Sequence, residues 1–103
     1  MKVERVGDTV RVSAIARLAA ADAKGFRESV MEQMRDGGKN IAIDLSQTTF
    51  IDSSGLGALV ALRKAAIGQQ GALRLLNPQP PVQQILELTR LDALFEIVNP
   101  GRT

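Results

Sequence analysis

Stretches with the two-residue period of a β-strand alternate along this chain with stretches that have the 3.6-residue period of an α-helix. Two short runs rich in β-branched residues, Val3–Val6 and Val10–Ile15, are separated by Gly7-Asp8, a pair suited to the tight turn of a hairpin. After this hairpin, strands and helices alternate. Parallel strands need such crossover connections, so the pattern predicts an α/β fold with a mixed β-sheet, an N-terminal antiparallel hairpin and alternating helices.

The remaining elements follow from apolar periodicity and from the glycines and prolines that interrupt it. Helices are predicted over Ala21–Arg35, over Ser54–Ile67 and from Pro80 onward, and strands over Asn40–Leu45, Leu73–Leu76 and Leu94–Val98. Gly37-Gly38 is expected to end the first helix. No repeat or linker divides the chain, so residues 1–103 are predicted to form one domain.

The chain contains neither histidine nor cysteine. Without them, the usual general base at neutral pH, a thiol nucleophile and the commonest zinc ligands are all excluded. We therefore expect no enzyme, no metal ion and no cofactor. A hydrophobic content of 45% in 103 residues is enough for one core without disulfides, and the lack of cysteine favours a reducing, cytoplasmic location.

The charge pattern argues against nucleic acid as a partner. Thirteen Lys and Arg residues face 11 Asp and Glu residues, and the basic residues are scattered rather than clustered. The three aromatic residues, Phe26, Phe50 and Phe95, are spaced like core residues rather than like a row that stacks on bases. No run approaches the roughly 18 apolar residues of a membrane helix, so we expect no direct membrane insertion.

The stretch FIDSSGLG, Phe50 to Gly57, stands where a helix is predicted to begin. Its simplest interpretation is a cap, because the side chain of Asp52 or Ser53 can accept hydrogen bonds from the free amides of the first turn. A hydrolase is disfavoured, because the nucleophile elbow needs a glycine two residues before the serine and a histidine elsewhere. A dinucleotide fingerprint is disfavoured as well, because Val60 stands at the third glycine position.

The segment after this stretch, Leu56 to Leu62, is apolar on nearly every helical face. A helix that lies on a small sheet normally has a polar face toward solvent. Either these turns are buried on two sides or they are exposed for a partner. Because double burial is difficult to arrange in 103 residues, we expect a protein-binding patch beside the serines.

The stretch IDLSQTTFIDSSGLGALVAL, Ile43 to Leu62, resembles the signature of the STAS domain, in particular its stand-alone bacterial form, the anti-sigma-factor antagonists. The resemblance extends over essentially the whole chain, through the opening hairpin, the region Leu18 to Asp22 and the late Asn77-Pro78. It implies a single STAS-like domain that is not an enzyme but the substrate of its partner. That partner is an anti-sigma factor, a serine kinase that phosphorylates the domain, and a dedicated phosphatase removes the phosphate.

Carried over residue by residue, the resemblance assigns phosphorylation to Ser54, directly before the first glycine, with Ser53 as the alternative acceptor. The implied partner-binding residues are Asp22, Asp52, Ser53, Gly55, Leu56 and Gly57. Thr48 and Thr49 are possible secondary acceptors, although polar residues that close a strand usually satisfy the turn. The same fold also occurs as a STAS subunit of ABC-type phospholipid transport complexes, and that is the alternative function.

Overall fold

The computed structural model describes residues 1–99 and confirms the predicted fold class. The elements follow in the order β1 (Lys2–Val6), β2 (Thr9–Ser13), β3 (Arg17–Leu18), α1 (Ala20–Arg35), β4 (Asn40–Asp44), β5 (Phe50–Ile51), α2 (Ser53–Gly68), β6 (Leu73–Leu76), α3 (Pro80–Leu88), a 3-10 turn (Leu91–Ala93) and β7 (Glu96–Val98). Within residues 1–99, five strands form the main sheet in the order β1-β2-β4-β6-β7, and β3 and β5 form a separate small sheet.

The opening hairpin is antiparallel, as its sequence predicted, with Lys2 opposite Ser13 and Val6 opposite Thr9. Gly7 takes the positive φ of 64° that the tight turn requires and that glycine adopts without steric cost. All later neighbours in the main sheet, β2 with β4, β4 with β6 and β6 with β7, pair in parallel. The sheet is therefore mixed, with a single antiparallel edge.

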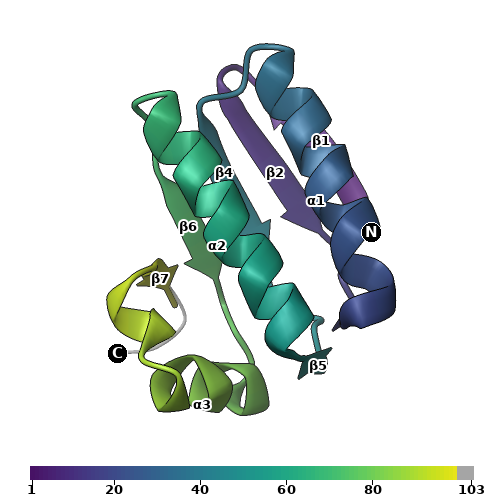
Figure 1. Cartoon of the computed structure of the whole chain (residues 1–103), viewed down its shortest axis with the longest axis vertical. Helices are drawn as coiled ribbons and strands as arrows, with labels where there is room; N and C mark the ends of the chain where they lie inside the picture. The colour runs from purple at the N-terminus through teal and green to yellow at the C-terminus, as the bar shows by residue number, and fades with distance from the viewer. Residues whose placement is uncertain (100–103) are drawn as a thin grey trace.

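Helices α1 and α2 lie side by side on one face of the main sheet, and their first turns lie at the same end of the molecule (Figure 1). The strands alternate between a buried and a more exposed side, which is the period expected where helices cover one face. The core between the layers includes Val10, Val12, Ile41, Ile43, Leu73 and Leu75 from the sheet, and Phe26 and Val30 from α1.

Helix α2 is buried on two sides, against α1 and against the sheet. Its buried residues are Gly55, Leu56, Ala58, Leu59, Leu62 and Ala66. Double burial, which the sequence analysis disfavoured, therefore holds for Leu56, Leu59 and Leu62, because α1 covers one side of α2 and the sheet covers another. Gly57, Val60 and Ala61 stay exposed or half-buried, so a protein-binding patch beside the serines stays a prediction.

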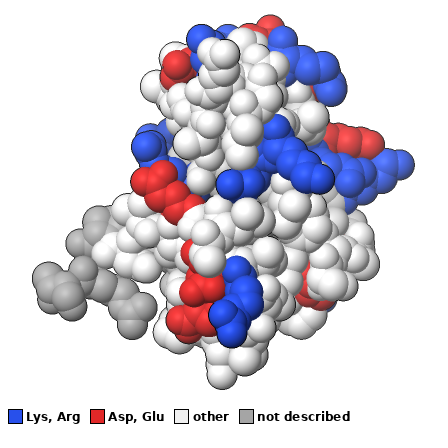
Figure 2. Space-filling view, turned by 60° about the vertical axis from the view of Figure 1, so that its left-hand side comes forward, with Lys and Arg blue, Asp and Glu red and all other residues white. Residues whose placement is uncertain are grey.

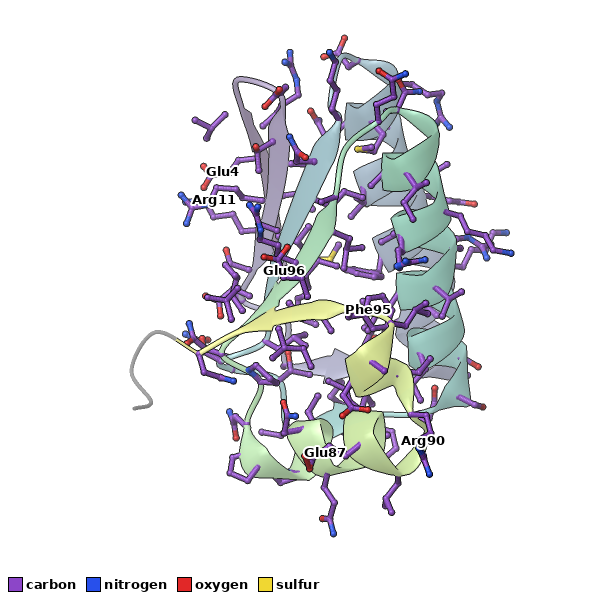
Figure 3. The ribbon with its side chains drawn as sticks, turned by 90° about the vertical axis from the view of Figure 1, so that its left-hand side faces the viewer. Glu4, Arg11, Glu87, Arg90, Phe95 and Glu96 are labelled. Carbon is purple, nitrogen blue, oxygen red and sulfur yellow. The ribbon has the colours of Figure 1, made fainter. Side chains whose placement is uncertain are left out.

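The face of the sheet opposite the helices is open and charged. One row across it is Glu4, Arg11, Ala42, Arg74 and Glu96, in direct cross-strand register. Glu4 and Arg11 project away from the helices (Figure 3), and Arg74 donates to Glu96 over 3.0 Å. On the face shown in Figure 2, acidic and basic side chains are interspersed with uncharged ones, so it carries no extended area of one sign.

Most predicted elements are confirmed to within a few residues, with two differences. The last strand is shorter than Leu94–Val98, because a 3-10 turn precedes it and Phe95 packs into the core. The small sheet of β3 and β5 was not predicted at all. Residues 100–103 lie outside the described residues. No helix within residues 1–99 is long and apolar enough to cross a membrane.

Candidate functional site

The segment FIDSSGLG is supported by the small parallel sheet of β3 and β5. Arg17 lies opposite Phe50 and Leu18 lies opposite Ile51, and the amide of Asp52 then donates to the Leu18 carbonyl over 3.3 Å. This pairing joins two loops more than 30 residues apart in the chain and carries the polypeptide directly into α2. The small sheet therefore sets where α2 begins.

The loop before β5 is held by two threonines. The buried hydroxyl of Thr48 donates to the Ile15 carbonyl over 2.6 Å, and Thr49 donates to the Ala16 carbonyl through its amide over 3.0 Å and through its hydroxyl over 3.3 Å. Because the Thr48 side chain is fully buried and hydrogen-bonded, the prediction of Thr48 as a secondary phosphate acceptor is wrong. Thr49 is exposed, so its role as a secondary acceptor stays a prediction.

Asp52 is the N-cap of α2, and its side chain also reaches α1. One carboxylate oxygen, Oδ1, accepts from the amides of Ser54 (2.9 Å) and Gly55 (3.1 Å), while Oδ2 accepts from the amide of Ala20 (3.0 Å). Both helix N-termini carry partial positive charge from unpaired amides, so one carboxylate stabilises two of them. Asp52 thereby fixes the first turns of α1 and α2 next to each other.

Ser53 and Ser54 occupy the first two helical positions after this cap, and both are exposed. The cap is Asp52 rather than Ser53, so the capping hydrogen bonds of α2 go to the Asp52 carboxylate and not to either serine hydroxyl. Each hydroxyl stands at the positive end of a helix in contact with solvent, which is an accessible place for an added anionic group.

The two glycines of the motif differ in their surroundings. Gly55 is buried, and a Cβ there would collide with the Leu18 carbonyl oxygen, so this glycine lets α2 lie directly on β3. Gly57 is exposed, and within residues 1–99 a Cβ there would meet nothing within 4 Å. Leu56 points inward and is only 9% exposed. Of the predicted partner-binding residues, Gly55 and Leu56 are therefore buried below the surface, where they support the first turn of α2.

Asp22 lies on the exposed first turn of α1, where its Oδ2 accepts from the amide of Ala19 over 3.1 Å. It borders an open groove of about 500 Å³ whose lining includes Met1, Ile15, Leu18, Phe26 and Ser29. Because Asp52 bonds the amide of Ala20, the structure brings the first turn of α1 next to the serines. Asp22 is thus exposed near the serines, while its role in binding stays a prediction.

Phe50 contradicts the expectation that all three aromatic residues belong to the core. Phe26 and Phe95 are buried, but the Phe50 ring is 46% exposed and the guanidinium carbon of Arg17 lies 5.3 Å from its centroid. The two-residue strand β5 turns Ile51 inward and Phe50 outward. Sequence periodicity missed this residue because two residues are too few to show an alternation.

The described part of the chain holds no cluster of three acidic residues arranged to bind a metal ion. What the site offers is an exposed pair of serine hydroxyls, two adjacent helix N-termini and a capping carboxylate between them. Fold and site together define a mixed-sheet α/β domain that displays serines at the start of its second helix.

Comparison with known proteins identifies the family to which this domain belongs. The STAS domain family matches residues 1–100, and the chain belongs to it, which confirms the resemblance in the sequence. A "putative anti-sigma factor antagonist" of Thermotoga maritima is 31% identical over 93 residues, which is 89% of this chain and 82% of that protein. A STAS-domain containing protein of Pseudomonas aeruginosa is 37% identical over 59 residues, 57% of this chain; the match spans only 58% of that relative's length.

Solved structures show the same fold. The crystal structure of a Thermotoga maritima protein described in the same words superimposes with a TM-score of 0.86 at 29% identity, over 93% of this chain and 83% of that one. The anti-sigma factor antagonist SpoIIAA from Bacillus has been solved in an unphosphorylated form, with a TM-score of 0.83 at 20% identity over 97% of this chain and 89% of that one. It has also been solved in a phosphorylated form, with a TM-score of 0.72 at 19% identity over 97% and 92% of the two chains.

Proposed function

We propose that this protein is an anti-sigma-factor antagonist controlled by phosphorylation of Ser54. In this proposal the unmodified chain binds a serine kinase that acts as an anti-sigma factor, and the sigma factor is released. Phosphorylation of Ser54 ends the binding, and a phosphatase restores it. The observation that carries the proposal is the exposed Ser54 hydroxyl on a capped helix start, inside the family's motif.

A phosphate on Ser54 is compatible with this fold. It adds about −1.5 to −2 charges at neutral pH. Next to the free amides of a helix N-terminus a negative charge is worth about 0.3 to 1 kcal/mol, and here the first turn of α1 adds a second positive end. The carboxylate of Asp52 opposes this effect by like-charge repulsion, because its Oδ1 is bonded to the Ser54 amide. The two effects offset one another, so we expect the domain to stay folded.

The phosphate instead lowers the affinity for the partner. The exposed surface around Ser54 contains Ser53, Gly57 and, on the neighbouring helix, Asp22. A partner that covers this surface must desolvate the phosphate beside two carboxylates, those of Asp52 and Asp22, and an unpaired buried charge weakens binding by several kcal/mol. The modification therefore acts on binding far more strongly than on stability.

The test compares Ser54→Ala, Ser54→Glu and the wild type as ligands for proteins of the host. Wild type and Ser54→Ala should retain a serine kinase, and Ser54→Glu should lose it, by at least tenfold in affinity. Ser53→Ala is the matched control, since its hydroxyl is also exposed and adjacent. Equal binding by Ser54→Ala and Ser54→Glu removes Ser54 from the mechanism.

Phosphate mapping by mass spectrometry decides between the two serines. We expect the added mass on Ser54 in the wild type and in Ser53→Ala, and none in Ser54→Ala. Capture of an ABC-type ATPase by every variant would overturn the proposal in favour of the phospholipid transport subunit.

A further inference from the structure

We propose that Phe50 and Arg17 form a docking platform for the kinase that phosphorylates Ser54. The kinase binds this platform in an apolar pocket with carboxylates at its rim. This inference rests on the proposed function. It concerns how the kinase recognises the folded domain, and it places that recognition outside the motif residues that surround the serine.

The first argument is the unusual position of Phe50. The two other phenylalanines are in the core, whereas Phe50 keeps 46% of its surface exposed on an outward-facing strand position. Aromatic residues and arginine are the types that most often dominate the binding energy of protein interfaces. Here one of each is paired, with the guanidinium carbon of Arg17 5.3 Å from the ring centroid.

The pair is also held in place before any partner arrives. Arg17 and Phe50 are direct cross-strand neighbours in the small sheet, and the cation–π contact restricts both side chains. Binding orders few additional degrees of freedom when side chains are already fixed, so such a pair is favourable as an anchor.

The distance between Phe50 and Ser54 places the platform within the footprint of an enzyme that acts on Ser54. Phe50 precedes Ser54 by four residues, so their Cα atoms are at most about 14 Å apart. A specific interface buries about 800 Å² on each partner, which as a disc has a radius of about 16 Å. An enzyme that centres its active site on Ser54 therefore has Phe50 within the reach of an ordinary interface.

The charge of the platform defines the chemistry of the partner surface. Within residues 1–99, no carboxylate lies within 4 Å of the Arg17 guanidinium. Arg17 is exposed and available for a bidentate bond to an acidic side chain. The ring needs an apolar pocket and the guanidinium needs an acid beside it, which together give an acid-rimmed apolar pocket.

Initial rates of Ser54 phosphorylation test the platform, measured by intact mass in host extract supplied with Mg·ATP and purified chain. At limiting concentration, Phe50→Ala should be phosphorylated at least tenfold more slowly than wild type. Raising its concentration should restore the rate, because lost docking raises KM and leaves kcat unchanged. Arg17→Glu should behave likewise, with Arg17→Ala between it and the wild type.

Two controls match the exposure and the charge of these variants. Ile67 is 49% exposed in the last turn of α2, about 20 Å from Ser54 along the helix, and Ile67→Ala should keep the wild-type rate within twofold. Arg35→Glu makes the same charge change at the far end of α1 and should also keep it. Should Phe50→Ala fail to fold, Arg17→Glu decides the question.

The outcomes separate this inference from the proposed function. Phosphorylation of Phe50→Ala and Arg17→Glu at the rate of their controls overturns the docking platform alone. No phosphate on Ser54 of the wild type overturns the proposed function and the platform with it. A tenfold loss in both platform variants, recovered at high concentration and absent from both controls, establishes the platform.

Discussion

The two ends of the α1–α2 pair are built alike but with different chemistry. At the end where both helices start, Asp52 accepts from the amide of Ala20, 32 residues away, over 3.0 Å. At the opposite end, Asn40 accepts from the amide of Ala72, also 32 residues away, over 2.9 Å. Each end is thus closed by one polar side chain that crosses between distant segments.

A closely packed glycine completes each end. Gly55 lies on the carbonyl of Leu18, and Gly71 lies on the carbonyl of Lys39, so that a side chain at either glycine would collide with the backbone. The difference lies in charge and exposure. An uncharged amide is enough to close the far end, whereas the near end uses a carboxylate and leaves two hydroxyls in solvent. The far end shows that such a contact does not need a charged side chain. The negative charge of Asp52 therefore matters for its neighbours, the two exposed serines, and not only for joining the segments.

The largest expected effect tests the similarity between the two ends. Gly55→Ala and Gly71→Ala should each lower the free energy of unfolding by about 3 kcal/mol, because an added Cβ meets rigid backbone rather than a flexible side chain. Urea denaturation followed by circular dichroism measures both. A loss below about 1 kcal/mol at either position would show that this end relaxes easily and that the two ends are not equivalent.

An intermediate effect sharpens the difference between the two crossing side chains. Asp52→Ala removes the cap of α2 and the bond to α1, and should lower the free energy of unfolding by about 2 kcal/mol. Asn40→Ala removes one accepted bond from Ala72, and we expect about 1 kcal/mol. Asp52→Asn keeps an acceptor and should fall between wild type and Asp52→Ala. Equal losses for Asp52→Ala and Asn40→Ala would contradict the double role of Asp52.

The smallest effect has the opposite sign. Gly57→Ala should raise the free energy of unfolding by about 1 kcal/mol, because alanine favours a helix interior and its Cβ meets nothing within 4 Å in the described residues. Gly25→Ala, in the interior of α1 with the same free space, is the matched control and should gain about as much. Gly57→Ala should also slow Ser54 phosphorylation, since its methyl group adds bulk beside the serines. A gain in stability with an unchanged rate would place the partner elsewhere.

Much of this fold could be predicted from sequence because its elements are long enough to show their periods. The alternation of strands and helices, the hairpin turn at Gly7 and a cap at Asp52 or Ser53 are all local patterns, and the structure has them, with Asp52 as the cap. The candidate site could be placed at a helix start for the same reason, since FIDSSGLG contains a capping residue directly before a helix, whereas the roles of its serines stay predictions.

The parts that could not be predicted depend on contacts distant in sequence. Strands β3 and β5 contain two residues each, and they pair across 33 positions, so neither has a period of its own. The exposure of Phe50 follows from that pairing. The double burial of α2 depends on α1 lying beside it, and no property of Leu56–Leu62 alone distinguishes a helix covered on two sides from one that awaits a partner.

The bond from Asp52 to the amide of Ala20 has a consequence for the order of folding. Closing a loop of about 30 residues costs conformational entropy before any contact offsets it, so a contact of this sequence separation forms with the tertiary structure and not before it. An unfolded or truncated chain still contains Asp-Ser-Ser-Gly, but without the neighbouring α1 turn and the β3–β5 pair it cannot present them in this arrangement. An enzyme that recognises this arrangement distinguishes folded from nascent copies, and a short peptide with the same sequence should be a poor substitute for the domain.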